Sequence, residues 1–314
     1  MSCASPASAH ARPAGTRSAA KREIPALGIA CYILGLQLTI IRYNTRLALR
    51  TRGEGPIHDL RVAIRRFRTA LRLFKPFLRE TPADRVSRQL QTMNRRLGPI
   101  RDAQVWSGFL TEGNPAGDAA HSPGWQRCLR LASKSRLARE RTITGILASP
   151  RHRSLLRQAA RLVRVDIPRV QRSRNNAGGR QFLATALLKT LDRLPRSYEA
   201  ALSENIEAAH RFRRRCRRAR YLAEFATPAL GHTADKLARR LKDVADALGD
   251  RHDAEVQLER LAVCGGAPDE LVQIVKGRRR EARRRFDKAW KRLFAPRFRK
   301  TVRETLKSRN GGSE

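Results

Sequence analysis

The most constraining feature of this 314-residue sequence is a pattern of histidine and arginine that occurs twice. In both copies a histidine is followed by arginine at positions +3, +7 and +10, and the second copy begins 152 residues after the first. Row one consists of His58, Arg61, Arg65 and Arg68, and row two consists of His210, Arg213, Arg217 and Arg220. A pattern this specific indicates an internal duplication, which restricts the fold to two related units.

Two further matches follow the rows in the same order. Residues 97–105 share a Leu-Gly pair and an Asp-Ala pair with residues 248–256, at an offset of 151. Residues 150–157 share Pro-Arg-x-Arg and a final Arg with residues 296–303, at an offset of 146. Three ordered matches with slowly drifting offsets support duplication of the whole unit.

The Leu-Gly and Asp-Ala pairs are typical of helix boundaries. We interpret Gly98 and Gly249 as C-terminal stops of helices, and Asp102 and Asp253 as N-caps of the helices that follow. Arg101 then lies just before a helix start, where an anion is stabilised.

Row one occupies a single face of its predicted helix. At about 100° per residue, offsets of 0, 3, 7 and 10 share an arc of about 80°, and Arg72 extends this arc by one more position. An apolar stripe at core-facing spacing lies beside the row, and the second copy keeps the stripe with smaller residues. The stripes are Leu60, Ile64, Phe67, Leu71 and Phe74, and Phe212, Cys216, Ala219, Ala223 and Ala226.

The fold class follows from the absence of any useful alternation with a period of two, which predicts an all-α fold. Helices of the first half are expected over 24–52, 56–79, 84–97 and 102–164, the last broken near 113–124 and at Pro150. The predicted boundaries are a disordered basic tail over 1–22, a domain over 23–308 with repeat one at 24–165, a linker at 166–180 and repeat two at 181–308, and a C-terminal tail over 309–314.

The segment 24–41 contains no charged residue and is followed by Arg42 and Arg46. It has the composition of a short membrane span or of the core of a signal peptide. Basic residues flank it on both sides, so no orientation signal is present. We predict a buried first helix without stable membrane insertion, and the membrane interpretation stays open.

The charge of the chain favours a polyanionic partner. Lysine and arginine number 67 against 28 acidic residues, which gives a formal net charge of +39. Self-repulsion of this size opposes compaction unless an anion binds. A solvated basic face is the simpler explanation for any one row, but recurrence of the same register favours an anion site. Further candidates align in the next helix of each half and are Arg85, Arg88, Lys236 and Arg239.

The five cysteines are scattered, odd in number and form no CxxC pair. This distribution predicts neither a disulfide framework nor a zinc site. It is most typical of a reducing, cytoplasmic location.

At the two rows and at residues 97–105 the sequence resembles the CHAD family, the conserved histidine α-helical domain, and the resemblance extends over about residues 24–308. The resemblance implies two tandem four-helix bundles related by pseudo-twofold symmetry, with basic helices facing a shared groove. It also implies that the eight side chains of rows one and two bind inorganic polyphosphate, and that the protein associates with polyphosphate granules. The ExExK signature of a fused triphosphate-tunnel domain is absent, so a stand-alone binding module is expected.

Three functions remain in competition at this stage. The leading prediction is binding of inorganic polyphosphate without catalysis, cofactor or metal. A nucleic-acid-binding protein is the alternative, although the chain has only ten Phe, three Trp and four Tyr residues for base stacking. A polyphosphate-processing enzyme is the third, and no acidic cluster, P-loop or HExxH motif indicates one. Chain-length preference and oligomeric state are not predictable from the sequence.

Overall fold

We describe the protein from a computed structural model over residues 24–51, 54–78, 80–112, 122–167, 178–199, 206–265 and 267–308. Within these residues every regular element is helical, apart from an isolated bridge between Pro25 and Gly178, so the predicted all-α class is confirmed. The predicted tails at 1–22 and 309–314 lie outside the described residues, as do residues 168–177 of the predicted linker.

The helices are α1 (Ala26–Thr51), α2 (Glu54–Leu73), α3 (Glu80–Arg96), α4 (Gly98–Glu112), α5 (Pro123–Leu147), α6 (Pro150–Arg161), α8 (Gly179–Arg193), α10 (Ile206–Cys264), α11 (Asp269–Leu293) and α12 (Pro296–Lys307). Short turns of 3-10 helix lie at Lys75–Phe77 and Pro195–Ser197, and a π-helical turn at Leu162–Asp166 follows α6. The third duplicated match appears as α6 and α12, which both begin at a proline and both have 12 residues.

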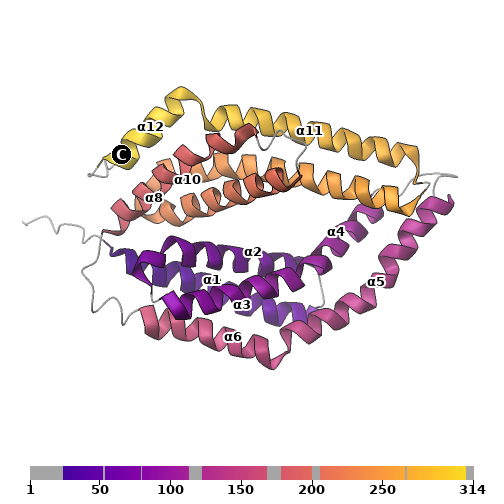
Figure 1. The fold of residues 1–314 in the computed structure, drawn as a ribbon, viewed down its shortest axis with the longest axis horizontal. Helices are drawn as coiled ribbons and strands as arrows, with labels where there is room; N and C mark the ends of the chain where they lie inside the picture. The colour runs from indigo at the N-terminus through magenta and orange to yellow at the C-terminus, as the bar shows by residue number, and fades with distance from the viewer. Residues whose placement is uncertain are drawn as a thin grey trace, which may run out of the picture.

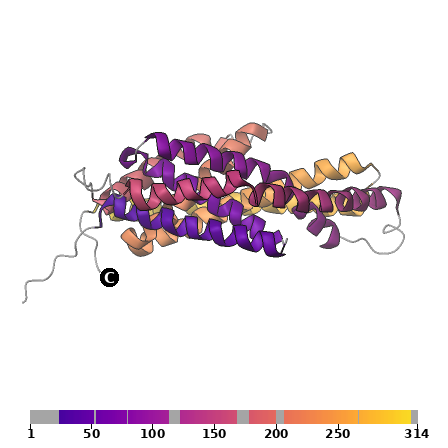
Figure 2. The ribbon, with the colours of Figure 1, turned by 90° about the horizontal axis from the view of Figure 1, so that it is seen from below.

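The helices form two layers, which Figure 1 shows one above the other. Helices α1, α2, α3 and α6 pack together below, and α8, α10, α11 and α12 pack together above. Contacts of α2 with α10 and of α1 with α8 join the layers. Figure 2 shows that α4, α5 and α11 extend at the end of the molecule away from the chain's C-terminus. The predicted repeat boundaries and the pseudo-twofold arrangement of two four-helix bundles stay predictions.

Helix α10 is a hairpin of two arms rather than one rod. Gly231 interrupts it with φ 64° and ψ −148°, a backbone conformation that favours glycine, and Pro228 precedes the break. Arg220 bonds Asp246 and Arg213 approaches Asp253, so the two arms run antiparallel. The first arm carries row two.

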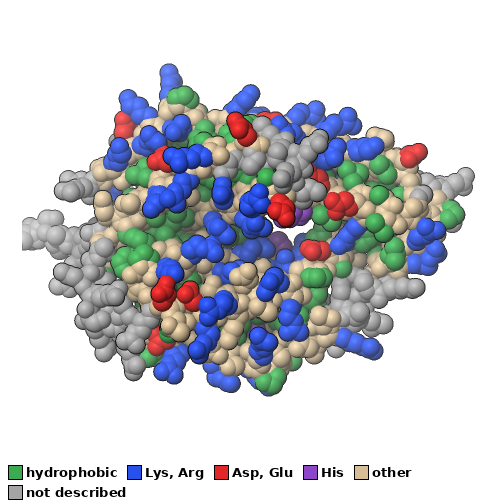
Figure 3. All heavy atoms as spheres, in the orientation of Figure 1, with side chains coloured by type: hydrophobic (Ala, Val, Ile, Leu, Met, Phe, Trp, Pro, Cys, Tyr) green, Lys and Arg blue, Asp and Glu red, His purple; other side chains and the backbone are tan. Residues whose placement is uncertain are grey.

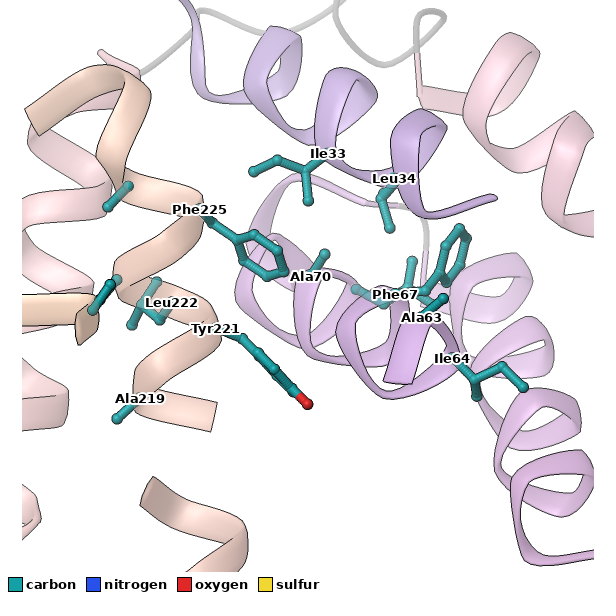
Figure 4. Close-up of a cluster of buried hydrophobic side chains, with 14 of the residues drawn as sticks. Ile33, Leu34, Ala63, Ile64, Phe67, Ala70, Ala219, Tyr221, Leu222 and Phe225 are labelled. Carbon is teal, nitrogen blue, oxygen red and sulfur yellow. The ribbon is translucent and has the colours of Figure 1, made fainter. Parts of the chain in front are cut away.

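The predicted apolar stripes form part of the main core. Leu60, Ile64 and Phe67 are fully buried, as are Cys216 and Ala219 of the second stripe. Bulk is redistributed in the second copy, because Tyr221 and Phe225 project from α10 toward α1 and α2 (Figure 4). Phe212 packs on Phe286 and Trp290 of α11 within its own layer, whereas Tyr221 and Phe225 join the two layers.

Helix α1 matches the predicted first helix. It contacts α2, α5, α6 and α8, and Leu27, Leu34 and Ile41 are buried. Among the described residues α1 is the one helix long and apolar enough to cross a membrane by length and composition, and 44% of its most apolar window is buried inside the structure. Tyr32 and Tyr43 remain exposed on its outer face. The absence of stable membrane insertion stays a prediction.

A second, smaller core lies where α4, α5, α10 and α11 meet. Trp106 and Trp125 pack there beside Cys128 and Cys264, which form a disulfide bond with a Cα–Cα distance of 5.5 Å. The expectation that the cysteines form no disulfide was therefore wrong. The two residues are 136 positions apart, and packing of α5 on the end of α10 brings them together, which no local spacing reveals.

Candidate anion-binding site

Rows one and two approach each other where α2 packs on the first arm of α10. Burial and the positive charges of Arg213 and of Arg65, which comes from the opposite layer, lower the pKa of Arg217 to about 10. Burial lowers the pKa of Arg213 as well, and Arg65 again contributes. Figure 3 shows a hollow between the layers with histidine visible inside it; lysine and arginine side chains gather beside the hollow, and acidic side chains also lie on its rim. The structure thus brings the centres of the two predicted rows together.

Row one uses neutral acceptors to hold its arginines. Arg61 Nη1 donates to the backbone carbonyl of Asn94 at 2.9 Å, and Arg68 Nη2 donates to Gln91 Oε1 at 2.7 Å. The Nε atoms of Arg65 and Arg68 are buried and have no hydrogen-bond partner among the described residues. A buried cationic donor without an acceptor is costly, so an external acceptor would stabilise this row.

Row two is partly neutralised from within the protein. Arg213 Nη2 lies 3.9 Å from Asp253 Oδ1, while its Nε atom is buried without a hydrogen-bond partner among the described residues. Arg220 Nε donates to Glu224 Oε1 at 2.7 Å, and Arg220 Nη1 lies 3.3 Å from Asp246 Oδ1. Arg220 therefore already has two carboxylate partners, unlike its row-one equivalent.

Two glycines of the duplicated Leu-Gly pair make close contact with the rows. A Cβ atom placed on Gly98 would lie 3.1 Å from Arg61 Nη1, and one placed on Gly249 would lie 3.3 Å from Arg213 Nη2. Gly98 begins α4 and Gly249 lies inside α10, so the prediction that both are C-terminal stops was wrong for Gly249. The repeated glycine instead leaves room for the arginine at +3 of each row.

The two aspartates interpreted as N-caps lie inside helices. Asp102 is the fifth residue of α4, and Asp253 lies in the second arm of α10, so the capping interpretation was wrong at both positions. Asp102 is not an N-cap because α4 already begins at Gly98, and Asp253 is not one because α10 continues through Gly249. Arg101 is likewise within α4, and its charge acts on His58.

Three histidines have a pKa below the ordinary value. Two of them, His58 and His210, begin the rows, and His252 lies beside row two. Burial, followed by Arg101 and Arg65, lowers the pKa of His58. The rings of His210 and His252 lie 4.3 Å apart and nearly perpendicular. Burial, followed by the charge of Arg213, lowers the pKa of His252 to about 4, and burial together with neighbouring arginines lowers that of His210. All three are neutral at pH 7 in the free protein and can donate hydrogen bonds.

The remaining predicted ligands lie nearer the periphery. Arg72 extends row one and lies close enough to Arg218 to lower its pKa. Arg85, Arg88 and Lys236 are exposed, and Arg239 Nη2 pairs with Asp235 Oδ2 at 2.7 Å within its own helix. Their role as second-row ligands stays a prediction.

Sequence reasoning missed two arginines at +8 of the duplicated pattern, Arg66 and Arg218. Arg66 forms an ion pair with Glu224 and lies 5.4 Å over the rings of Tyr221 and Phe225, which makes it a link between the layers. Loss of hydration and the charges of Arg72, Arg214 and Arg68 lower the pKa of Arg218 to about 10. The signal was available, because both residues keep the 152-residue offset of the rows.

The described residues include no group of three or more His, Cys, Asp or Glu side chains that could hold a metal ion.

Comparisons with known proteins find the same fold. The family model of the CHAD domain matches residues 32–262. A crystal structure of the CHAD domain from the plant Ricinus communis is similar with a TM-score of 0.63 and 21% identity, covering 97% of this chain and 99% of that chain. PptA from Streptomyces chartreusis is similar with a TM-score of 0.63 and 18% identity, covering 85% of this chain and all (100%) of that chain. No curated protein sequence matches. At these identities the two structures share the fold.

Proposed function

The chain belongs to the CHAD domain family, a polyphosphate-associated family, and from this premise we propose that it binds inorganic polyphosphate between rows one and two without catalysing a reaction on it. The observation that carries the proposal is the approach of Arg65 from one layer to Arg213 and Arg217 from the other. Such an arrangement of like charges is unfavourable in the free protein, and a linear polyanion between the rows relieves it.

Binding would proceed through phosphate oxygens alone. A guanidinium group can grip two oxygens at once, and contacts between charged donors and acceptors are roughly twice as strong as neutral ones. The Nε donors of Arg65, Arg68 and Arg213, which are buried without partners among the described residues, would gain acceptors. The neutral histidines would donate further hydrogen bonds, and nearby phosphate would raise their pKa.

Release of counterions would supply much of the driving force, so affinity would fall steeply with salt. Selectivity over RNA would arise from cations on both sides of the ligand, since polyphosphate has no bases to accommodate. We propose a location on polyphosphate granules as part of the same proposal; the Cys128–Cys264 disulfide bond removes the argument from the cysteines for a reducing compartment.

The test is a binding titration with the variant R61A/R65A/R213A/R217A. We expect loss of at least about 1,000-fold in affinity for long-chain polyphosphate, because four charge-assisted contacts disappear. A matched control, K276A/R279A/R280A/K288A, removes the same charge from exposed positions of α11 and should bind nearly as the wild type does. Circular dichroism verifies that both variants fold. Retained affinity in the row variant would contradict the proposed site.

The competing functions are outcomes of the same titration. RNA and heparin are added as competitors at equal phosphate or sulfate concentration and at two salt concentrations. Displacement of polyphosphate by RNA at parity would favour the nucleic-acid alternative. Release of inorganic phosphate by the pure protein in the presence of Mg²⁺ would favour an enzyme.

A further inference from the structure

A separate groove opens beyond the Arg72 end of row one, between α2, α8 and the first arm of α10. It has a volume of about 800 Å³. Its basic lining residues are Arg72, Lys189, Arg193, Arg196, Arg215 and Arg218. No carboxylate is among the described residues that line it.

Helix α8 and the 3-10 turn that follows it supply one side of this groove with three cations. Lys189 and Arg193 lie one turn apart, and Arg196 follows in the 3-10 turn. All three are exposed. The two hydroxyl groups of the lining donate to their own helices, Thr69 to the carbonyl of Arg65 at 2.9 Å and Thr190 to that of Ala186 at 2.7 Å. The donors directed at the groove are therefore cationic.

The groove continues the line of the two rows. Row one together with Arg72 spans about 21 Å of helix, at about 1.5 Å per residue. Arg72 belongs to both features, and Arg218 of the groove feels the charges of Arg68 and Arg72. A linear anion lying between the rows would reach the groove by extending past Arg72, without crossing a carboxylate among the residues that line it.

We propose that the α8 groove binds the segment of a long polyphosphate chain that extends beyond Arg72, and so makes affinity depend on chain length. This inference rests on the proposed function, because it assigns the groove to the same ligand. A short chain occupies the rows alone, whereas a long chain gains the cations of α8. An extended anion suits the site because the cations are spread along the lining rather than converging on one point.

The experiment compares tripolyphosphate with long-chain polyphosphate on the variant K189A/R193A/R196A. We expect long-chain affinity to fall about tenfold, which corresponds to about 1.4 kcal/mol shared among three exposed charge pairs. The slope of log affinity against log salt should become shallower by about two for the long chain. Affinity for tripolyphosphate should not change. The control K276A/R279A/R280A makes the same charge change on α11 and separates a local contact from loss of net charge.

The outcomes distinguish this inference from the proposed function. Equal long-chain affinity in the α8 variant and the α11 control would overturn the groove assignment while leaving the rows intact. A parallel loss for tripolyphosphate would also overturn it, because the groove would then not sense length. If the wild type binds neither chain, the proposed function itself fails. Thermal melting of each variant confirms that the fold is retained.

Discussion

Rows one and two share a register but differ in what surrounds their arginines. The hydrogen bonds of row one, among the described residues, go to the carbonyl of Asn94 and the amide of Gln91. Row two faces the carboxylates of Asp253, Asp246 and Glu224. The repeated pattern keeps the position of the cations. Burial lowers the pKa of Arg61, and Asp102, the row-one equivalent of Asp253, acts to raise it, so the surroundings differ most at Arg68 and Arg220. Row one depends more on an external anion, and row two is partly stabilised by the protein itself.

The arginines at +8 show the same divergence. Arg66 is bound to Glu224 and stacked on aromatic residues of the other layer, so it serves the fold. Arg218, at the equivalent position, lines the α8 groove. Equivalent positions of a duplicated helix can thus be divided between structure and binding.

Among changes that distinguish the two rows, the largest expected effect comes from disabling one row at a time. We predict that R61A/R65A weakens polyphosphate binding about 100-fold and R213A/R217A about tenfold, because Asp253 already offsets part of the row-two charge. Fluorescence anisotropy with a labelled long chain measures both. Equal losses would mean that the internal carboxylates do not distinguish the rows. Thermal melting checks that neither variant is unfolded.

A smaller effect, of opposite sign, is expected for Glu224→Gln. Glu224 accepts from Arg220 at 2.7 Å and also pairs with Arg66. Removing its charge leaves Arg220 less neutralised from within the protein, so we predict binding about tenfold tighter with a steeper salt dependence. Asp235→Asn, which alters the ion pair with Arg239 on the periphery, is the control. Unchanged or weaker binding by E224Q at full folding would show that Arg220 contributes nothing to the site.

The smallest effect concerns pH. The pKa of His252 is about 4 in the folded protein, below the ordinary value of 6.5, so the unfolded chain binds more protons between these values. The free energy of unfolding of the free protein should therefore fall as pH decreases from about 6.5 toward 4, by about 1 kcal/mol over the first pH unit. Urea unfolding at pH 7 and pH 5 measures this loss. H252N should reduce the difference more than H58N, and equal profiles would contradict the placement of His252.

Much of the fold followed from the helical period and the duplication. The buried stripe from Leu60 to Phe74 and its smaller copy were predictable because spacing alone determines which side of a helix meets the core. The approach of Arg61 to Gly98 and of Arg213 to Gly249 was encoded in the repeat, but the glycines were assigned to helix ends. That an arginine needs a glycine beside it becomes visible only when the position of the arginine is known.

The rest depended on contacts that sequence distance conceals. Asp246 reaches Arg220 only because α10 reverses at Gly231. Pro228 and Gly231 are local signs of a break, but they do not show which residues the reversal brings together. The cations of the α8 groove come from three helices, so no single window contains them. The Cys128–Cys264 bond is hidden for the same reason.

That disulfide has a mechanical consequence. The loop it closes contains row two, whereas row one lies outside it, between Cys128 and the N-terminus. A pulling force applied through the chain's ends would pass from α5 to α10 across the sulfur atoms and would not stretch the intervening chain. Under tension row one would bear the force and row two would be shielded. A molecule pulled by its ends would therefore keep the structure of row two.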